Sequence, residues 1–289
     1  MNIGLIDVDG KHFPNLALMK ISAYHKQLGD QVSFASLGYY DKLYYSKVFT
    51  FTPDYTDSFA SSDCIIKGGT GYKNFDTLAK EIEHILPDYT LYNCNSAYGF
   101  LTRGCIRKCP WCIVPEKEGS LKPNADIKEF LGNMKSAILL DNNVLASEWG
   151  LSQIEKIVDL KIKIDFNQGL DARIIASNPD IAKLLAKCKW LKPLRMACDT
   201  KAQMDSIEKA TNLLRQYGCT PKKYFIYCLV QDIEDAHERV LFLKSLNLSP
   251  FCQPFINFED GKTELQQRRF ARWVNMKAIF NTVEWKDYK

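Results

Sequence analysis

Three cysteines lie close together in the sequence, and their spacing could place three thiolates around one metal centre. Cys105, Cys109 and Cys112 are separated by three and by two residues. Thiolates on such a short loop can point inward together at a soft metal or an iron–sulfur cluster. Gly104 directly precedes the first thiol and allows close backbone approach. Basic neighbours should lower the thiol pKa values and offset the charge of a thiolate-bound cluster. These neighbours are Arg103, Arg107 and Lys108.

Zinc and disulfides are the alternative uses of these thiols. A structural zinc site needs four ligands, usually in two paired half-sites. The sequence has no second C-x-x-C or C-x-x-H pair, and Cys94 is a distant candidate for a fourth ligand. A disulfide framework is not expected, because no secretory signal is apparent. Three thiolates without a paired fourth ligand fit an iron–sulfur cluster with one open iron better than zinc. Cys198 and Cys228 are expected to be core residues.

The cysteine loop follows an expected strand and carries an aromatic residue, Trp111, directly before its last cysteine. In these features residues 95–258 resemble radical S-adenosylmethionine (SAM) enzymes. The resemblance implies a [4Fe-4S] cluster on the three cysteines, with SAM bound to the fourth iron and Trp111 beside the cofactors. Reduction of SAM by one electron would yield a 5′-deoxyadenosyl radical that takes hydrogen from a substrate. It also implies an external electron donor of the flavodoxin or ferredoxin type.

The resemblance places SAM contacts after the second and third strands. The second expected strand ends in Asp141, Asn142 and Asn143, similar to the segment that binds the SAM amino group. Turn formation or helix capping is the alternative for these residues. Candidates after the third strand are Asn167, Gln168, Asp171 and Arg173. The arginine could clamp the SAM carboxylate bidentately and the others could reach SAM or substrate, the alternative being a helix cap with an ion pair.

Two further candidates follow the fourth and fifth strands. Asp199 stands where the family contacts the ribose, although it could instead cap the helix expected from Lys201. The fifth strand, with Tyr227, would form an apolar wall beside the adenine, and core packing is compatible with that role.

Alternating strand and helix patterns should position these residues. Strands are expected at 136–140, 162–166, 194–198, 224–230 and 251–255, after a first strand near 91–97. Helices are expected at 127–133, 152–160, 178–186, 201–217 and 233–246. About six strand–helix units predict a partial (β/α)6 TIM-type barrel, with chemistry at the carboxyl ends of its strands. We expect this barrel at residues 96–258, and a C-terminal helix at 259–289.

Residues 1–95 should form a separate Rossmann-like, doubly wound α/β domain. Strands are expected at 3–8, 31–37 and 64–66, and helices from Pro14 to Gly29 and over 78–86. With Gly68-Gly69-Thr70-Gly71, this region resembles the cobalamin-binding-type domain fused to many radical SAM barrels. Asp9 stands where that domain has its cobalt-ligating histidine, and His12 is displaced. Cobalamin remains a candidate cofactor, but the departure favours a degenerate domain that shapes the substrate entrance.

Composition and charge exclude several protein classes. Among the 289 residues, 46% are hydrophobic and 25% charged, which excludes a disordered, collagen-like or coiled-coil chain. No apolar run reaches the length of a membrane helix, and we expect a cytoplasmic protein without membrane contact. The net charge of +4 lies in residues 261–289, which hold seven basic and three acidic residues.

That C-terminal segment predicts an amphipathic helix over 265–280. Phe270, Trp273, Val274 and Ala278 should share its apolar side, opposite Arg268, Arg269 and Arg272. The apolar side should pack on the barrel, closing its open edge. The basic side is either a solvated face or a docking surface for an anionic partner.

The main functional hypothesis is a radical SAM enzyme acting on a small molecule, a nucleotide or a protein. The alternatives are a cobalamin-dependent radical SAM methyltransferase, a nucleotide- or RNA-modifying enzyme, a non-catalytic iron–sulfur protein and a zinc protein. Nucleic acid as a partner is left open, because three arginines are few for sequence-independent binding. The sequence does not identify the substrate.

Overall fold

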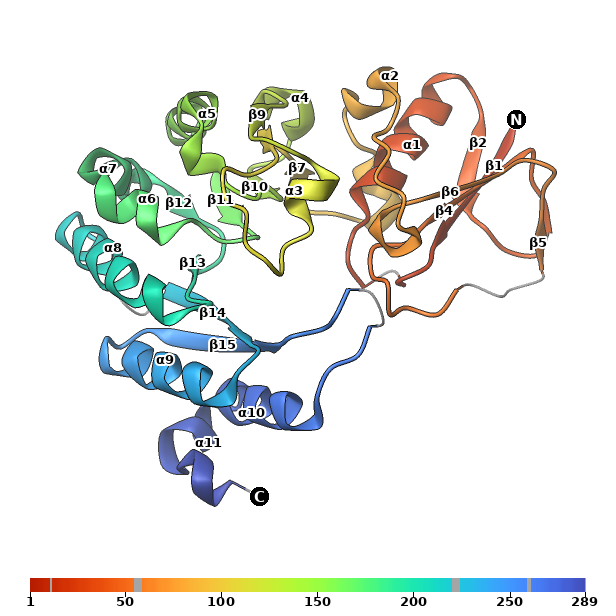
Figure 1. Cartoon of the computed structure of the whole chain (residues 1–289). Helices are drawn as coiled ribbons and strands as arrows, with labels where there is room; N and C mark the ends of the chain where they lie inside the picture. The colour runs from red at the N-terminus through yellow and green to blue at the C-terminus, as the bar shows by residue number, and fades with distance from the viewer. Residues whose placement is uncertain (11, 55–58, 220–223, 259–260, 289) are drawn as a thin grey trace.

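The computed structural model describes residues 1–289 except 11, 55–58, 220–223, 259–260 and 289, and shows a mixed α/β protein. Its N-terminal sheet has the strand order β2–β1–β4–β6, and all neighbouring strands are parallel (Figure 1). The strands are β1 (Asn2–Asp7), β2 (Gln31–Phe34), β4 (Lys42–Ser46) and β6 (Ile65–Gly68). Two short strands, β3 (Gly38–Tyr39) and β5 (Ala60–Ser61), pair beside this sheet.

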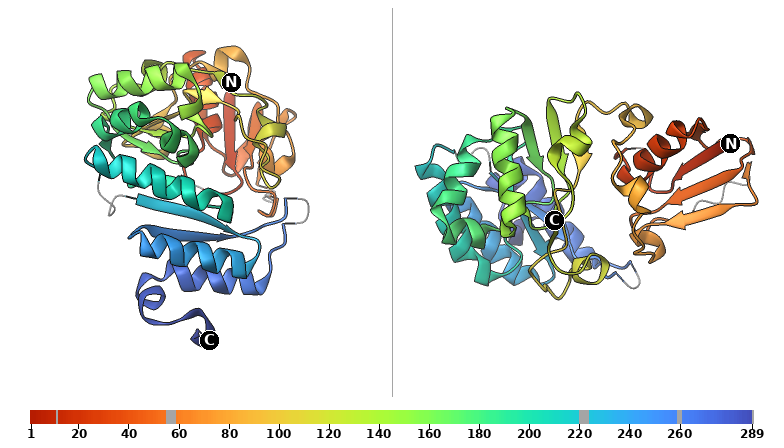
Figure 2. Two further views of the ribbon diagram at one scale, coloured as in Figure 1. Left: turned by 60° about the vertical axis from the view of Figure 1, so that its left-hand side comes forward. Right: turned by 90° about the horizontal axis from the view of Figure 1, so that it is seen from above.

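Helix α1 (Leu16–Gln27) covers one face of this sheet (Figure 2). It begins at Asn15, whose side chain accepts a hydrogen bond from the Leu18 backbone at 3.2 Å, as N-cap residues do. It ends before Gly29, whose φ of +81° suits a residue without a side chain. Leu18 packs against the buried residues Ile3 and Leu5 of β1, so the predicted strand and helix are confirmed.

The structure of residues 1–95 differs from the predicted doubly wound layout, which has helices on both faces of the sheet. In the described part of residues 1–95, no α-helix other than α1 is longer than the four residues of α2 (Lys80–Glu83). The sequence analysis also missed β4, which lies inside the sheet between β1 and β6. Only seven residues separate β2 from β4, too few for the helical crossover that normally joins parallel strands. The chain forms β3 there instead, and the described residues of this region lack the second helical layer of a doubly wound fold.

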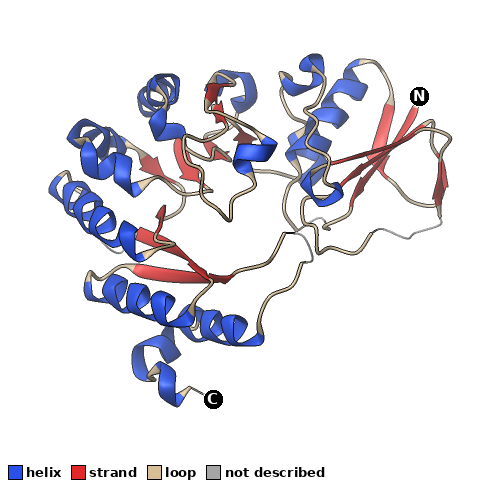
Figure 3. Ribbon diagram, in the orientation of Figure 1, coloured by secondary structure: helices blue, strands red, loops and turns tan. Residues whose placement is uncertain are grey.

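Residues 97–254 alternate strands with helices, as predicted. The strands are β7 (Ala97–Gly99), β10 (Ser136–Leu139), β11 (Lys163–Phe166), β12 (Lys189–Trp190), β13 (Leu194–Ala197), β14 (Tyr224–Val230) and β15 (Ser249–Pro254). The helices are α4 (Ile127–Leu131), α5 (Glu148–Asp159), α6 (Ala172–Ser177), α7 (Pro179–Lys187), α8 (Met204–Gln216) and α9 (Ile233–Ser245). The helices lie on the outer side of the strands (Figure 3).

These strands form two parallel sheets with the orders β12–β11–β10–β7 and β13–β14–β15. Leu170 joins the sheets through a parallel bridge to Met196, and its backbone N–H donates to the Arg195 carbonyl at 2.8 Å. Closure into a barrel remains a prediction. The cysteine loop lies between the antiparallel strand pair β8 (Thr102–Arg103) and β9 (Lys122–Pro123), and it leads into α3 (Val114–Lys117).

The C-terminal segment forms two helices rather than one, α10 (Leu265–Asn275) and α11 (Lys277–Thr282). Met276 interrupts them with φ −84° and ψ 84°, which is outside the helical region. Phe270 and Trp273 are buried as predicted, but Ala278 is exposed because the break changes the face that α11 presents.

Helix α10 closes the outer edge of β15, as expected. The Asn275 side chain accepts a hydrogen bond from the Cys252 backbone N–H at 2.8 Å and donates one to the Cys252 carbonyl at 2.9 Å. It thereby satisfies an edge strand in the way a neighbouring strand would. Arg269 does not belong to a free basic face, because its guanidinium donates to the Tyr288 carbonyl and lies over the Trp285 ring. No helix in the described residues is long and apolar enough to span a membrane.

Candidate functional site

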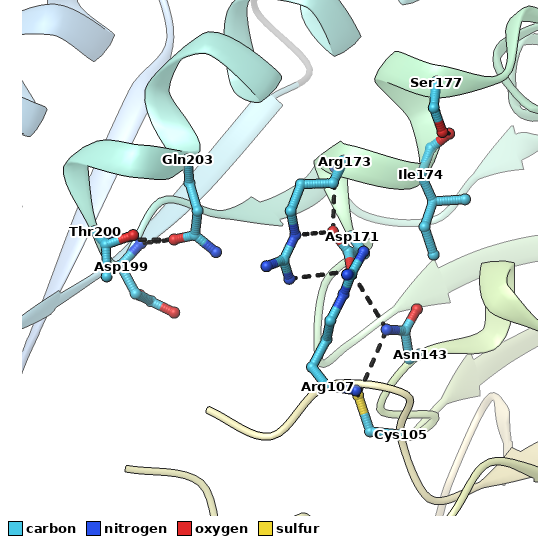
Figure 4. A network of polar contacts seen from close by, with 10 residues as sticks. All are labelled: Cys105, Arg107, Asn143, Asp171, Arg173, Ile174, Ser177, Asp199, Thr200 and Gln203. Carbon is cyan, nitrogen blue, oxygen red and sulfur yellow. Dashed lines mark hydrogen bonds and ion pairs between the residues drawn. The ribbon is translucent and has the colours of Figure 1, made fainter. Parts of the chain in front are cut away.

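Polar side chains that follow β10, β11 and β13 face one region beside the cysteine loop. Figure 4 shows Asn143, Asp171 and Arg173 close to Cys105, whereas Asp199 lies beyond Arg173 and farther from Cys105. These residues come from separate loops. The carboxyl ends of parallel strands meet at one edge of a sheet, which accounts for the convergence. The structure therefore brings together the main candidates that the sequence had placed at different strand ends.

Backbone and side-chain donors surround the sulfur of Cys105. The Arg107 backbone N–H lies 3.3 Å from Sγ, and the Asn143 amide nitrogen lies 3.5 Å from it. Donors of this kind stabilise negative charge on a thiolate or a cluster sulfur. Gly104 has φ +81°, and a Cβ there would lie 2.3 Å from the Ser120 carbonyl oxygen, so glycine is needed for the loop to reach this position.

The expectation that basic neighbours lower the thiol pKa values is wrong for two of the cysteines. Partial withdrawal from water raises the pKa values of Cys109, which is half-buried, and of Cys112, which keeps part of its surface exposed, and repulsion between the thiolates of the loop adds to it. Arg107 is directed to Asp171 instead, and Arg103 is directed to Glu118. Such thiols become good metal ligands only when a bound metal offsets the cost of their ionisation.

The cysteine loop does not hold its three thiols in the arrangement of a metal site. Within the described residues, no three Cys, His, Asp or Glu side chains are gathered closely enough to hold a metal ion. The three cysteines are free thiols, with Cys112 exposed and Trp111 half-buried beside it. Metal binding would have to draw the thiols together. Cys94 does not supply a fourth ligand, because its sulfur packs against Met19 at 4.0 Å. Cys198 and Cys228 are fully buried, as predicted.

Asp171 is the centre of the polar network. Its carboxylate accepts hydrogen bonds at 2.8 Å from the Nε atoms of both Arg107 and Arg173, and a weaker one from Asn143 at 3.4 Å. Burial by itself would raise the pKa of Asp171, but the two guanidinium groups hold it below its usual range. Asp171 also caps the N-terminus of α6 and forms an ion pair with Arg173. Both features of the alternative interpretation, a helix cap and an ion pair, are therefore present. Two positive charges share this one carboxylate.

Asn143 carries an unsatisfied polar atom at the site. Its side chain is buried, its amide nitrogen faces Cys105 and Asp171, and its carbonyl oxygen Oδ1 has no hydrogen-bond partner. A buried acceptor without a donor is costly, so a ligand that brings an N–H group would stabilise this position. The ammonium group of SAM fits that requirement, and the donors around Cys105 fit a thiolate-bound cluster.

Asp141 and Asn142 belong to the same segment, which was predicted to bind the SAM amino group, but they form hydrogen bonds to other residues of the chain. Asp141 is buried, and its carboxylate accepts hydrogen bonds from the Leu101 backbone at 3.1 Å and from the Thr102 hydroxyl at 2.7 Å. Burial raises the pKa of Asp141 to about 6. Asn142 donates to the Glu118 carboxylate at 3.0 Å. Both residues thus hold the chain around the cysteine loop, and their contact with SAM stays a prediction.

Glu118 is a site residue that the sequence analysis missed. Its carboxylate accepts a hydrogen bond from the Gly104 backbone at 2.9 Å, pairs with Arg103 at 3.4 Å, and also holds Asn142. It therefore connects the start of the cysteine loop to the end of β10. No sequence motif pointed to it, because its partners lie 14 to 24 residues away.

Asp199 faces the same region as the cysteines. Burial raises its pKa, one oxygen accepts from the Leu229 backbone at 2.9 Å, and its negative charge adds to the raised pKa of Cys109. It does not cap the following helix, since Thr200 does so in a capping box with Gln203.

The remaining residues that were predicted to contact SAM are Tyr227, Asn167 and Gln168. The Tyr227 hydroxyl donates to the Asn167 carbonyl at 3.4 Å, and its ring packs against Phe225 and Phe251, so this strand does form an apolar wall. Asn167 is half-buried, whereas the Gln168 side chain is exposed.

In the N-terminal region, the residues of the cobalamin-binding-type motif contact other residues of the same region. The Asp9 carboxylate accepts from the Phe49 backbone at 3.3 Å and from the Thr52 hydroxyl at 2.6 Å, so it holds the loop after β4. A Cβ on Gly69 would lie 2.3 Å from the Lys47 carbonyl oxygen, so close packing within the chain explains this glycine. Asp9 and Gly69 thus have structural roles within the N-terminal region, and cobalamin binding stays a prediction.

Comparison of the sequence with models of protein families and with curated proteins finds no match.

Proposed function

We propose that the protein is a radical SAM enzyme that binds a [4Fe-4S] cluster through Cys105, Cys109 and Cys112. The buried Asn143 side chain carries the proposal, because it links the end of β10 to the first cysteine while its own Oδ1 lacks a donor. When bound, the cluster would supply the electron that cleaves SAM to a carbon radical. The parallel strands and outer helices of residues 97–254 support the partial barrel that this chemistry uses.

Asn143 and Arg173 are the residues that we assign to the amino-acid end of SAM. Oδ1 of Asn143 lacks a donor but points away from Cys105 in Figure 4, so a turn of the amide would bring it to accept a hydrogen bond from the SAM ammonium group. Arg107 and Arg173 both pair with Asp171, and Asp199 interacts electrostatically with Arg173 without pairing with it. Arg173 is partly exposed, so its guanidinium can also be presented to the SAM carboxylate.

Asp199 and the β14–β15 wall are assigned to the nucleoside end. One carboxylate oxygen of Asp199 is used by the Leu229 backbone, which leaves the other for the ribose hydroxyls. The rings of Tyr227 and Phe251 lie on the next two strands and offer apolar surface to the adenine. We further propose a cytoplasmic protein that takes its electron from an external redox partner.

Anaerobic reconstitution with iron and sulfide, followed by dithionite and SAM, tests the assignment. We expect about four irons per chain and release of 5′-deoxyadenosine. The Asn143→Ala variant should keep iron but bind SAM about tenfold more weakly, because it removes the acceptor for the ammonium. Asn281→Ala, at an exposed position on α11, is the matched control and should behave as the wild type.

The outcomes separate the two main functional classes. A protein that binds iron but never cleaves SAM would be an iron–sulfur carrier, and the enzyme proposal would be wrong. Binding of one zinc ion without iron would exclude both the radical SAM enzyme and the iron–sulfur carrier. Equal SAM affinity in the wild type and in Asn143→Ala would leave the cluster in place but overturn the role of Asn143.

A further inference from the structure

A cavity of about 470 Å³ lies next to the cysteine loop and is lined in part by Arg103 and Glu118. One wall is the segment from Gly69 to His84, which leaves the N-terminal sheet, and the other is formed around α3 and β9. None of the SAM candidates after β10, β11 and β13 lines it. The volume is within the range of sites for small molecules. The cavity therefore has room for a ligand of its own.

Most of the charged side chains that line this cavity without an ion-pair partner are basic. Two of its three carboxylates are already neutralised, since Glu83 pairs with Lys20 at 3.0 Å and Glu118 pairs with Arg103. Three lysines complete the walls: Lys80, Lys117 and Lys122. Across the described part of the chain, the ammonium groups of these three lysines form no hydrogen bond or ion pair. Asp76 is the remaining acidic residue of the lining, so the unpaired charges sum to two positive.

Lys117 is held in a position that suits a bound anion. Its side chain is half-buried at the end of α3, and burial lowers the pKa of its ammonium group. An ammonium that is partly withdrawn from water without a fixed acceptor is destabilised. An anionic ligand in the cavity would supply the acceptor.

We propose that this cavity binds a phosphate-bearing small molecule, with its phosphate between the ammonium groups of Lys117, Lys122 and Lys80. A phosphate monoester carries close to two negative charges at neutral pH, which matches the net unpaired charge of the lining better than one carboxylate does. Phe75, which also lines the cavity, provides apolar surface for the rest of the ligand. The site does not need the metal centre, because its lining includes none of the three cysteines.

Titration calorimetry at low ionic strength tests the proposal, with inorganic phosphate, ribose 5-phosphate and ribose as probes. Cluster-free protein is sufficient, so failure here leaves the radical SAM proposal unaffected. We expect saturable binding of both phosphate compounds and none of ribose. Lys117→Gln should weaken the binding about tenfold or more, because it removes a charge-assisted hydrogen bond, and Lys122→Gln should weaken it several-fold.

Lys187→Gln is the matched control, because Lys187 is exposed on α7 and does not line the cavity. It should leave phosphate affinity unchanged. The proposal is wrong if neither phosphate compound binds saturably, or if ribose binds as well as ribose 5-phosphate. It is also wrong if the two cavity variants bind like the wild type, or if Lys187→Gln weakens binding as much as Lys117→Gln.

Discussion

The buried carboxyl of Asp141 should make the stability of this protein depend on pH in a specific direction. Burial raises its pKa from 3.8 to about 6, although hydrogen bonds from Thr102 and Leu101 partly oppose the shift. In the unfolded chain the same carboxyl ionises near its ordinary pKa of about 4. Between these two values the folded protein therefore holds a proton that the unfolded chain has released.

The sign and the size of the effect follow from that difference. Stability from this group is fully present below about pH 4 and is lost as the pH rises through about 6. A shift of about two pKa units corresponds to about 3 kcal/mol, of which most is lost between pH 4 and pH 7. The Asp141→Asn variant has no charge to bury, and its one oxygen can still accept from Thr102. Its amide nitrogen would face the Leu101 N–H, at a cost of about 1–3 kcal/mol at every pH.

Urea unfolding of the two metal-free proteins from pH 4 to pH 7 measures the effect. The free energy of unfolding of the wild type minus that of Asp141→Asn should fall by about 2–3 kcal/mol over this range. All other titrating groups cancel in the difference. A difference that stays constant, or that grows as the pH rises, would refute the burial of a proton on Asp141. In Asp141→Ala the Leu101–Thr102 turn loses its acceptor, so this variant should also retain less iron after reconstitution.

Three other results are expected. Changing any one of the loop cysteines to Ala should abolish assembly of the cluster, and a variant that keeps four irons per chain would contradict the ligand assignment. Asp199→Asn keeps an acceptor for the Leu229 backbone but loses the charge, so calorimetry on reconstituted protein should show SAM affinity reduced about tenfold. Arg268 and Arg272 are exposed, and changing both to Gln should alter neither stability nor RNA binding, which we expect to be absent from the wild type at low salt. Salt-sensitive RNA binding that the double variant loses would instead make this face a docking surface.

The sequence by itself determined the alternation of strands and helices and the position of the chemistry. Period and breaker signals are local, so Pro14 and Gly29 were enough to predict the helix that the structure shows as α1, and the apolar run of residues 224–230 was enough to predict β14. The spacing of the three cysteines predicted a metal loop, and polar residues after successive strands predicted a shared site. These features depend on a few neighbouring residues, which a sequence displays directly.

Only the tertiary structure decided what each polar residue touches. Asp141 and Asn143 are two positions apart in one polar segment, yet one is buried against the Leu101–Thr102 turn and the other reaches Cys105. Glu118 and the lysine-lined cavity depend on segments that are distant in the chain, and no local pattern encodes such a meeting. The sequence analysis also missed the central strand β4, whose Tyr44 and Tyr45 favour a strand but whose place in the sheet comes from pairing with β1 and β6.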